Sequence, residues 1–565
     1  MNREIEIVAG LLEKQDIGLA KEEILANIEI PPERAMGDYA FPCFKLAKTM
    51  RKSPVAIAGD LAQSLTVPMP FHKVEAAGPY VNFFVDRSYR VRNLLQAVLE
   101  KDAYGSADMG RGQTVIVEFS STNIAKPFHI GHLRSTVIGN ALRNIYKKLG
   151  FKTIAINHLG DYGTQFGMMI AAYKKWGDMD TIRRDPIPAM LDLYVRYNKE
   201  AEADPAYKEE ARYWFKELEE GNPEAVQLWQ TFKDLSLKEF SRVYDLLGIQ
   251  FDSWNGESFY SDKMDAVIQK LEEKNLLELS DGARIVDLKD ENMPPALIQK
   301  SDGSTLYITR DLAAAIYRKN TYDFDKNLYV VGAPQALHFQ QLFAVLRKMG
   351  HAWADDCEHI PFGHIGMEEG AMSTRHGKVI FLEEVLHKAI DKTAEIIDAR
   401  NPSLQDKETV AQQVGIGAVI FQELFNNRIK DYTFQWDRTL SFEGETGPYV
   451  QYTHARACSI LARAEGAEIP EDVTPLTENE EAYRLIQAMD EYPDAILDAM
   501  QKNEPYLLTR QILEIAKQFN KFYNTTPILR AEGKARAAYL SLVDACRVIL
   551  KDGLSVLGIE APQKM

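Results

Sequence analysis

The chain has 565 residues, of which 45% are hydrophobic and 26% charged, a composition typical of globular proteins and not of disordered ones. Length alone allows about four domains. The net charge of −16 excludes a uniformly basic surface, although residues 501–565 hold ten Lys or Arg against six Asp or Glu. A basic track on an otherwise acidic protein is compatible with RNA binding, and a solvated helical bundle is the alternative.

No apolar targeting segment follows Met1, and no run is long enough to cross a bilayer, so we expect a cytoplasmic protein without a membrane contact. The four cysteines, Cys43, Cys357, Cys458 and Cys546, are far apart and form no C-x-x-C pair. This spacing argues against a disulfide framework and against protein-bound zinc. We expect buried thiols and no metal site.

Residues 1–105 form the first predicted module. Helical patterns run through Leu11–Ile28 and Pro54–Leu65. The alternation of Val74–Val85 predicts a strand with one buried face.

The stretch Glu118–Thr136 joins a predicted buried strand, Thr114–Phe119, to a long helix. The helix begins near Leu133, because apolar residues then recur at helical spacing, and it ends before a glycine at position 150. A second strand is predicted over Phe151–Asn157. The whole is a βαβ unit whose loop lies where open parallel sheets bind ligands.

His129, Gly131 and His132 occupy this loop. Helix N-termini carry unpaired amides and partial positive charge, so a triphosphate can lie there, and the two histidines can donate to it. Gly131 lets the adenine or ribose approach the backbone. Taken singly, each histidine is more simply a helix cap and the glycine a turn, but the run together in a strand–loop–helix context favours a nucleotide site.

The run His-Ile-Gly-His at 129–132 resembles the HIGH signature of class I aminoacyl-tRNA synthetases, and Glu118–Arg134 resembles its arginyl-tRNA synthetase version. Further likenesses to that family follow in the expected order and extend the resemblance over almost the whole chain. They are Asn157–Gly167, Tyr307–Asp311, Gln335–His338, Met372–Arg375 and Gly447–Arg456.

The resemblance implies that residues 1–105 are the family's extra N-terminal domain, which meets the outer corner of the tRNA. Asn82 and Phe84 are the candidates for hydrogen bonding to and stacking on a splayed base. Without the resemblance, Phe84 is more simply a core residue.

Residues 176–264 change to charged, aromatic helical material, which we interpret as an insertion within the nucleotide-binding domain, residues 106–380. Trp214, Trp229 and Phe240 are expected to pack helices together.

The second half of that domain begins with a turn at residues 301–304, a predicted strand over Thr305–Thr309 and a predicted helix over Asp311–Arg318. Asp311 can simply cap that helix. An arginine-selective pocket, however, needs carboxylates, because burying an unpaired guanidinium is prohibitively costly. Glu118 and Asp311 are the candidates. By resemblance, the arginine site also includes Ser121, Asn123, Tyr307 and Gln335, and His338 lies near the adenosine.

The segment His364–Lys378 resembles the family's KMSKS loop but departs from it, with Ala371 and Thr374 at the two lysine positions. In the family this loop brings positive charge to the β- and γ-phosphates as pyrophosphate leaves. Lys126 is the first candidate to supply that charge. The equally weighted alternative is that Lys126 is a surface lysine with only a structural role. Arg375 and Lys378 are the next candidates, and by resemblance the loop's ATP contacts are Met372, Ser373 and Lys378.

From residue 381 the chain is predicted to be helical, as a stem over 381–430 and a domain over 431–565 that resembles the family's anticodon-binding domain. Tyr449, Tyr452, Phe522 and Tyr523 are candidates to stack unpaired bases, each worth ~1 to 3 kcal/mol. Since tyrosines at helical spacing are mostly core residues, we expect only one or two to contact RNA.

The predicted architecture is α/β: a class I Rossmann-type parallel-sheet catalytic domain with a helical insertion, an α+β N-terminal domain and an all-α C-terminal domain. The resemblance implies that the chain joins L-arginine to tRNA(Arg) through an arginyl adenylate, using ATP with Mg²⁺, as a monomer, and that activation waits for bound tRNA. Catalysis is then positioning and charge stabilisation by His129, His132, Lys126 and Arg375.

Two alternatives remain at this point. A class I synthetase for lysine or glutamate would share the nucleotide loop, although glutamate needs basic pocket residues. An RNA-binding paralogue without catalysis is suggested by Ala371.

Overall fold

The computed structural model describes residues 3–31, 36–100, 103–301, 306–367, 380–464 and 469–565. It divides into two compact units. Unit 1 comprises Met1–Asp102, Ala464–Asp490 and Lys521–Ala545, and unit 2 comprises Ala103–Arg463, Glu491–Asn520 and Cys546–Met565. The division at residues 105, 380 and 430 stays a prediction.

Unit 1 contains a three-stranded antiparallel sheet in the order β1-β3-β2. The single strand predicted over Val74–Val85 is wrong, because the chain turns at Gly78 (φ +57°) and its two arms pair as a hairpin. The elements are α1 (Arg3–Glu13), α2 (Lys21–Leu25), β1 (Tyr39–Pro42), α3 (Leu46–Met50), α4 (Pro54–Ser64), β2 (Phe71–Ala77), β3 (Tyr80–Val85), α5 (Arg87–Leu99), α19 (Thr474–Glu478) and α20 (Glu480–Asp490).

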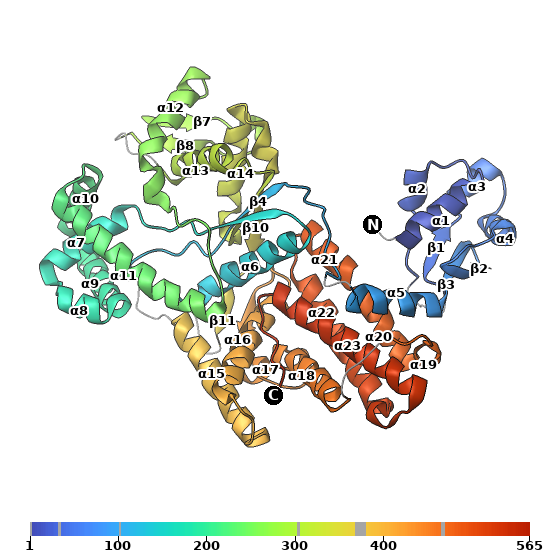
Figure 1. Ribbon diagram of the computed structural model, residues 1–565. Coiled ribbons are helices and arrows are strands. Elements are labelled where there is room, and N and C mark those ends of the chain that lie inside the picture. The colour runs from blue at the N-terminus through green and yellow to red at the C-terminus, as the bar shows by residue number, and fades with distance from the viewer. Residues whose placement is uncertain (1–2, 32–35, 101–102, 302–305, 368–379, 465–468) are drawn as a thin grey trace. The chain divides into compact units, whose positions relative to one another are not determined.

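Unit 2 is organised on a four-stranded parallel sheet in the order β10-β9-β4-β5. Figure 1 labels two of its strands, β4 and β10. The central strand β4 (Thr114–Glu118) is buried at every position and pairs with β5 (Lys152–Ile156) on one side and β9 (Lys326–Gly332) on the other. Helix α6 (Leu133–Lys148) connects β4 to β5, so the predicted βαβ unit is confirmed. The edge beyond β4 and β9 is the switch point at which such sheets bind ligands.

Helix α13 (Tyr307–Tyr322) corrects the prediction for the following segment. The strand predicted over Thr305–Thr309 is wrong at residues 306–309, which the structure describes. Among these, only Leu306 is extended, and the chain is helical from Tyr307. Asp311 therefore lies in the second turn and does not cap the helix. Its spacing of four residues from Tyr307 and seven from Arg318 places all three on one side of α13.

Helices α7 to α11 gather as the group predicted to be an insertion (Figure 1). Phe240 is 1% exposed and Trp214 packs against a buried cluster, which confirms their packing role. Trp229 also donates its indole N–H to the backbone oxygen of Asp161 (2.8 Å). The helices are α7 (Thr164–Trp176), α8 (Met179–Arg184), α9 (Pro186–Ala203), α10 (Ala206–Glu219) and α11 (Pro223–Leu247).

The remaining elements of unit 2 include a small antiparallel sheet, β6-β7-β8, and a parallel pair, β11 and β12. No helix in the described ranges is long and apolar enough to cross a membrane. The elements are α12 (Met264–Glu273), β6 (Glu278–Ser280), β7 (Ala283–Val286), β8 (Ala296–Gln299), α14 (Ala336–Lys348), β10 (Cys357–Phe362), β11 (Ile365–Met367), α15 (Leu382–Arg400), α16 (Lys407–Leu424), β12 (Tyr432–Phe434), α17 (Trp436–Thr439), α18 (Gly447–Ala464) and α21 (Tyr492–Gln501). Helices α22 (Tyr506–Thr525) and α23 (Gly533–Val556) each contribute residues to both units.

Candidate active site

The loop between β4 and α6 brings two imidazole rings together at the start of the helix. The rings of His129 and His132 stack with their centroids 3.9 Å apart. The backbone N–H of Gly131 donates to Nδ1 of His129 (3.1 Å), and the backbone N–H of His129 donates to Nδ1 of His132 (3.2 Å). Because each Nδ1 accepts, each neutral ring carries its proton on Nε2, where it can be donated to a phosphate oxygen.

Both rings are neutral at physiological pH. Burial lowers the pKa of His129 to about 4, and the charge of Lys126 acts in the same direction. Burial and the neighbouring His129 hold the pKa of His132 well below its usual range. The Lys126 ammonium also lies 5.2 Å from the centre of the Tyr194 ring on α9. The pair is thus a fixed set of neutral donors, with one cation close by.

The second predicted phosphate-binding segment lies outside the described residues. The predicted residues in this segment are Ala371, Met372, Ser373, Thr374, Arg375 and Lys378. The chain that leaves this segment is hydrogen-bonded to the histidine loop: Ile130 N–H donates to the Ile380 oxygen (3.2 Å), and Leu382 N–H donates to the Phe128 oxygen (2.8 Å).

A buried ion pair ties the first turn of α6 to helix α16. Nε of Arg134 lies 2.6 Å from Oε1 of Glu423, and both side chains are fully buried. Tyr432 donates its hydroxyl to Oε2 of the same carboxylate (2.7 Å). Nη1 of Arg134 donates to the backbone oxygens of Lys430 (2.9 Å) and His364 (3.4 Å). Arg134 therefore holds together α6, α16 and the backbone that enters β11 and β12.

Glu118, predicted to face the substrate guanidinium, has a partner within the chain. Its Oε2 lies 2.5 Å from Nη1 of Arg318, with 6% and 1% of the two side chains exposed. Nη2 of Arg318 lies 3.3 Å from Nδ1 of His158. Arg318, seven residues beyond Asp311, thus reaches back to the end of β4, and the predicted role of Glu118 in binding arginine stays a prediction.

Asp311 lies at the same edge of the sheet and pairs with histidines. Its Oδ2 is 2.6 Å from Nε2 of His338, and its Oδ1 is 3.7 Å from Nε2 of His158. Although burial opposes ionisation, hydrogen bonding and charge from His338 lower the pKa of Asp311. Burial opposes the charged form of His338 too, but Asp311 and Glu118 raise its pKa overall. His338, predicted near the adenosine, thus contacts the predicted arginine-binding acid.

Two further acids near Asp311 were not among the predicted site residues. Oε2 of Glu257 is 3.0 Å from Nη1 of Arg310, and burial raises the pKa of Glu257 to about 7. Oδ2 of Asp161 is 2.6 Å from the Lys233 ammonium, and the Asp161 side chain is fully buried. Asp161 lies in Asn157–Gly167, one of the segments that resemble the family, whereas nothing local distinguishes Glu257.

The other predicted arginine-binding residues lie on the loops around this edge. Ser121 has a φ of +46°, and its buried Oγ has no hydrogen-bond partner in the described part of the chain. Asn123 pairs in a parallel bridge with Gly160, where a Cβ would collide with the asparagine amide. Tyr307 is 64% exposed, and Gln335 is exposed at the start of α14. The roles of these four residues in binding arginine stay predictions.

The predicted base-stacking tyrosines of unit 2 line one cavity. It has a volume of about 530 Å³ and is walled by α15, α18 and α22 together with the C-terminal residue. Tyr449 and Tyr452 face it from α18, and Tyr452 is 38% exposed. The Arg456 guanidinium lies 4.8 Å from the centre of the Tyr452 ring. An aromatic face beside a cation is the usual setting for an unpaired base.

The predicted RNA contacts of unit 1 divide into buried and accessible side chains. Phe522 is fully buried and packs edge-on against Tyr539, with ring centroids 5.6 Å apart, so its assignment as a base-stacking residue is wrong. Asn82 is 4% exposed, and its Oδ1 has no partner among the residues described. Tyr523 is 39% exposed, and Phe84 is partly exposed beneath Lys73 (4.8 Å to the ring centre).

Comparison with known proteins defines the class. A family model described as the catalytic domain of class I tRNA synthetases (R) matches residues 93–436. A DALR anticodon-binding domain model matches residues 450–565, and an arginyl-tRNA synthetase N-terminal domain model matches residues 5–85. Together with the parallel sheet and the histidine loop, these matches make the chain a class I aminoacyl-tRNA synthetase, an aminoacyl-tRNA ligase.

Full-length relatives narrow the class to one family. The chain is 56% identical to an arginine–tRNA ligase of Clostridioides difficile and 55% identical to one of Halothermothrix orenii, with 99% of each chain covered. Its fold matches the arginyl-tRNA synthetase of Thermus thermophilus with a TM-score of 0.84 and 25% identity over the whole of both chains. The chain belongs to the arginyl-tRNA synthetase family.

Proposed function

We propose that this chain attaches L-arginine to tRNA(Arg) in two steps. The carboxylate of arginine attacks the α-phosphate of ATP, giving arginyl adenylate and pyrophosphate. The 2′-hydroxyl of the tRNA's terminal adenosine then takes the arginyl group and releases AMP. No side chain forms a covalent bond, so the protein contributes positioning and charge stabilisation.

The distribution of charge at the sheet edge carries this proposal. Glu118, Glu257 and Asp161 each pair with a permanent cation of the chain, namely Arg318, Arg310 and Lys233. The contacts described for Asp311 pair it with His338 and His158, both titratable, and the guanidinium of Arg318 acts on it only as a nearby charge. A guanidinium entering the site can replace the proton on His338 as the counter-ion of Asp311. A lysine substrate would present a point charge to Asp311 in place of the planar guanidinium, and the side-chain carboxylate of a glutamate substrate would be repelled by Asp311.

ATP is assigned to the loop of the stacked histidines. Neutral Nε2–H groups and the partial positive charge at the start of α6 favour an anion there. His129, Gly131 and His132 contact the nucleotide, as do Met372, Ser373 and Lys378, while Lys126 and Arg375 place charge on the departing pyrophosphate. ATP enters as its magnesium complex, so Mg²⁺ belongs to the substrate.

The amino and carboxylate end of arginine is assigned to Ser121 and Asn123. The unpartnered Oγ of Ser121 and the close approach of Asn123 to Gly160 support this. Tyr307 and Gln335 cover the side chain from α13 and α14.

The tRNA is assigned to both units. In unit 2 the cavity of Tyr449 and Tyr452 takes an unpaired base, and in unit 1 Asn82, Phe84 and Tyr523 contact RNA. We further propose that bound tRNA is required for activation, and that the protein acts as a monomer in the cytoplasm. Its segments are then residues 1–105 for tRNA contact, 106–380 for catalysis, 381–430 as a stem and 431–565 for the anticodon. Light scattering of the purified chain tests the oligomeric state.

Aminoacylation with radiolabelled amino acids tests the proposal. Pure protein with tRNA(Arg), ATP and Mg²⁺ should charge arginine but neither lysine nor glutamate. Asp311→Asn should raise the KM for arginine at least 100-fold, whereas Asp323→Asn, at the exposed end of the same helix, should not change it; the ratio corresponds to about 3 kcal/mol for a charge-assisted pair. Absence of arginyl-tRNA would favour an RNA-binding protein without catalysis, and equal KM values for the two variants would remove Asp311 from the pocket.

A further inference from the structure

The loop that leaves β4 has a backbone conformation that its own residues do not favour. Ser120, Ser121 and Ala125 have φ angles of +70°, +46° and +58°, in the left-handed region that residues other than glycine rarely adopt. Strained residues of this kind persist only where the surrounding structure holds them. Because the loop carries Ser121 and Asn123, the residues assigned to arginine, the contacts that hold it bear on substrate binding.

Helix α11 of the insertion holds this loop at two points. The Tyr244 hydroxyl oxygen lies 2.7 Å from Oγ of Ser120, and Oγ of Ser236 accepts from the backbone N–H of Ala125 (2.9 Å). All four residues are buried. Tyr244 and Ser236 are eight residues apart, which is about two turns of the helix. One stretch of α11 therefore supports both ends of the strained loop.

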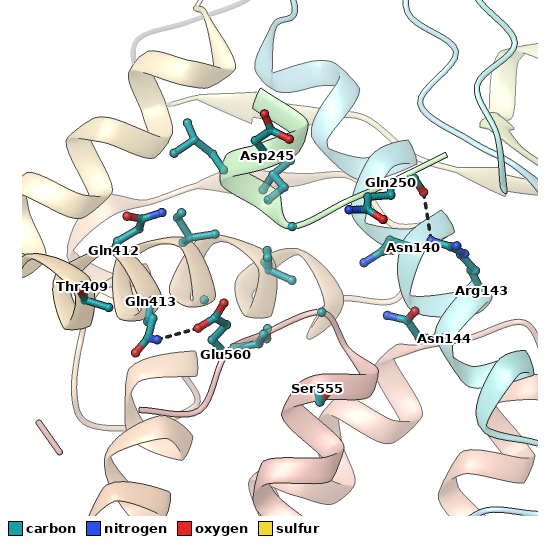
Figure 2. Close-up of a pocket in the computed structure, with 18 residues that line it drawn as sticks. Asn140, Arg143, Asn144, Asp245, Gln250, Thr409, Gln412, Gln413, Ser555 and Glu560 are labelled. Atoms are coloured by element: carbon teal, nitrogen blue, oxygen red, sulfur yellow. Dashed lines mark hydrogen bonds between the residues drawn. The ribbon is translucent and has the colours of Figure 1, made fainter. Parts of the chain in front are cut away.

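The end of α11 that carries Tyr244 is tied to α6 and to β5. Just after the helix, the backbone oxygen of Gln250 accepts from the guanidinium of Arg143 on α6 (3.0 Å), as a dashed line in Figure 2 shows. The same guanidinium lies 3.6 Å from Oδ2 of Asp252, which accepts from the backbone N–H of Ala155 in β5 (2.8 Å). These contacts fix Tyr244 relative to the parallel sheet.

Four hydrogen bonds form one chain through Tyr244, and their direction follows from counting protons. Each hydroxyl has a single proton to donate. Thr136 donates its proton to the backbone oxygen of His132 (2.7 Å), so its Oγ1 accepts from Ser120 (2.9 Å). The Oγ of Ser120 therefore accepts from the Tyr244 hydroxyl, whose oxygen accepts from the side-chain amide of Asn157 (2.9 Å). The chain runs from the residue after β5 to the histidine loop.

We propose that Tyr244 is a positioning residue of the arginine site, an inference that rests on the function proposed above. Its hydroxyl links Asn157 to Ser120 and so holds the strained loop in the conformation in which Ser121 and Asn123 bind arginine. Burial raises the pKa of Tyr244, so the hydroxyl stays protonated and the chain keeps its direction at physiological pH. The insertion thus contributes to the amino-acid site through α11.

Tyr244→Phe tests the proposal, because it removes one oxygen and keeps the ring contacts with Phe128 and Phe251 (centroids 5.2 and 5.0 Å apart). Ser120 can still donate to Thr136, so the end of the chain at the histidine loop remains. Steady-state formation of arginyl-tRNA by the full chain, at saturating tRNA, should show a KM for arginine raised about tenfold, equivalent to about 1.4 kcal/mol. The KM for ATP should stay within twofold of the wild type.

Tyr197→Phe is the matched control. Tyr197 is a fully buried residue of α9 in the same insertion, and it donates its hydroxyl to the backbone oxygen of Tyr207 (2.7 Å). Both variants lose a buried hydrogen bond and should lose similar stability in urea unfolding, but only Tyr244→Phe should change the KM for arginine. A KM for arginine within twofold of the wild type in Tyr244→Phe, or an equal rise in both variants, overturns the proposal. Absence of arginyl-tRNA with the wild-type chain would instead refute the proposed function, and this inference with it.

Discussion

The buried pair of Arg134 and Glu423 makes the sharpest prediction about how the first turn of α6 is held. In Glu423→Gln the side chain keeps its shape but has one acceptor oxygen in place of two, so it can accept from Tyr432 or from Arg134 but not from both, and the fully buried guanidinium loses its only carboxylate partner in the described structure. Removing one member of a buried pair costs about 3 to 5 kcal/mol, and we expect the lower figure because an amide oxygen remains. Opening of α6 should become about 100-fold more frequent.

Native-state hydrogen exchange of α6 amides, followed by mass spectrometry, measures this opening directly. Glu209→Gln is the matched control, because its pair with Arg212 is exposed on α10 and such pairs contribute about 0.2 to 1 kcal/mol. Arginine activation by Glu423→Gln should show a lower kcat with the KM for arginine nearly unchanged. Exchange rates in α6 within threefold of the wild type would refute the reasoning. The double variant Arg134→Met/Glu423→Leu should recover most of the stability, since it leaves no buried charge.

Three further predictions concern titration, RNA contact and the core. Asp311 raises the pKa of His338, so their ion pair stabilises the folded chain below the ordinary histidine pKa and is lost as pH rises through the raised pKa. The charged imidazolium of His338 competes with arginine for Asp311, so the KM for arginine should fall as pH rises through that range. His338→Gln should remove this dependence of the KM on pH. Tyr452→Ala should weaken tRNA binding by about 5- to 150-fold, equivalent to 1 to 3 kcal/mol of stacking, without changing the KM for ATP; an unchanged Kd would remove Tyr452 from the RNA site. Phe522→Ala should instead lower the stability of the fold by about 3 to 5 kcal/mol in urea unfolding, and a selective loss of tRNA binding without destabilisation would contradict its place in the core.

The sequence alone determined the features whose causes are local. A β-branched run, a polar loop with two histidines and a helical apolar repeat sufficed to place β4, α6 and β5 and the nucleotide loop between them. Helical periodicity likewise anticipated the insertion and α15 and α16. The motifs that resemble the arginyl-tRNA synthetases identified the family before any contact was known.

Tertiary structure decided which charges meet. The partner of Glu118 is 200 positions away at Arg318, and that of Arg134 is 289 positions away at Glu423; no local pattern encodes either pair. Tyr307–Thr309 were predicted to lie in a strand but form the first turn of α13, and in that helix Asp311 and Arg318 reach the same edge of the sheet. Side-chain type indicates what chemistry a residue can perform, but long-range packing determines whether its charge is neutralised within the chain or left available for a substrate.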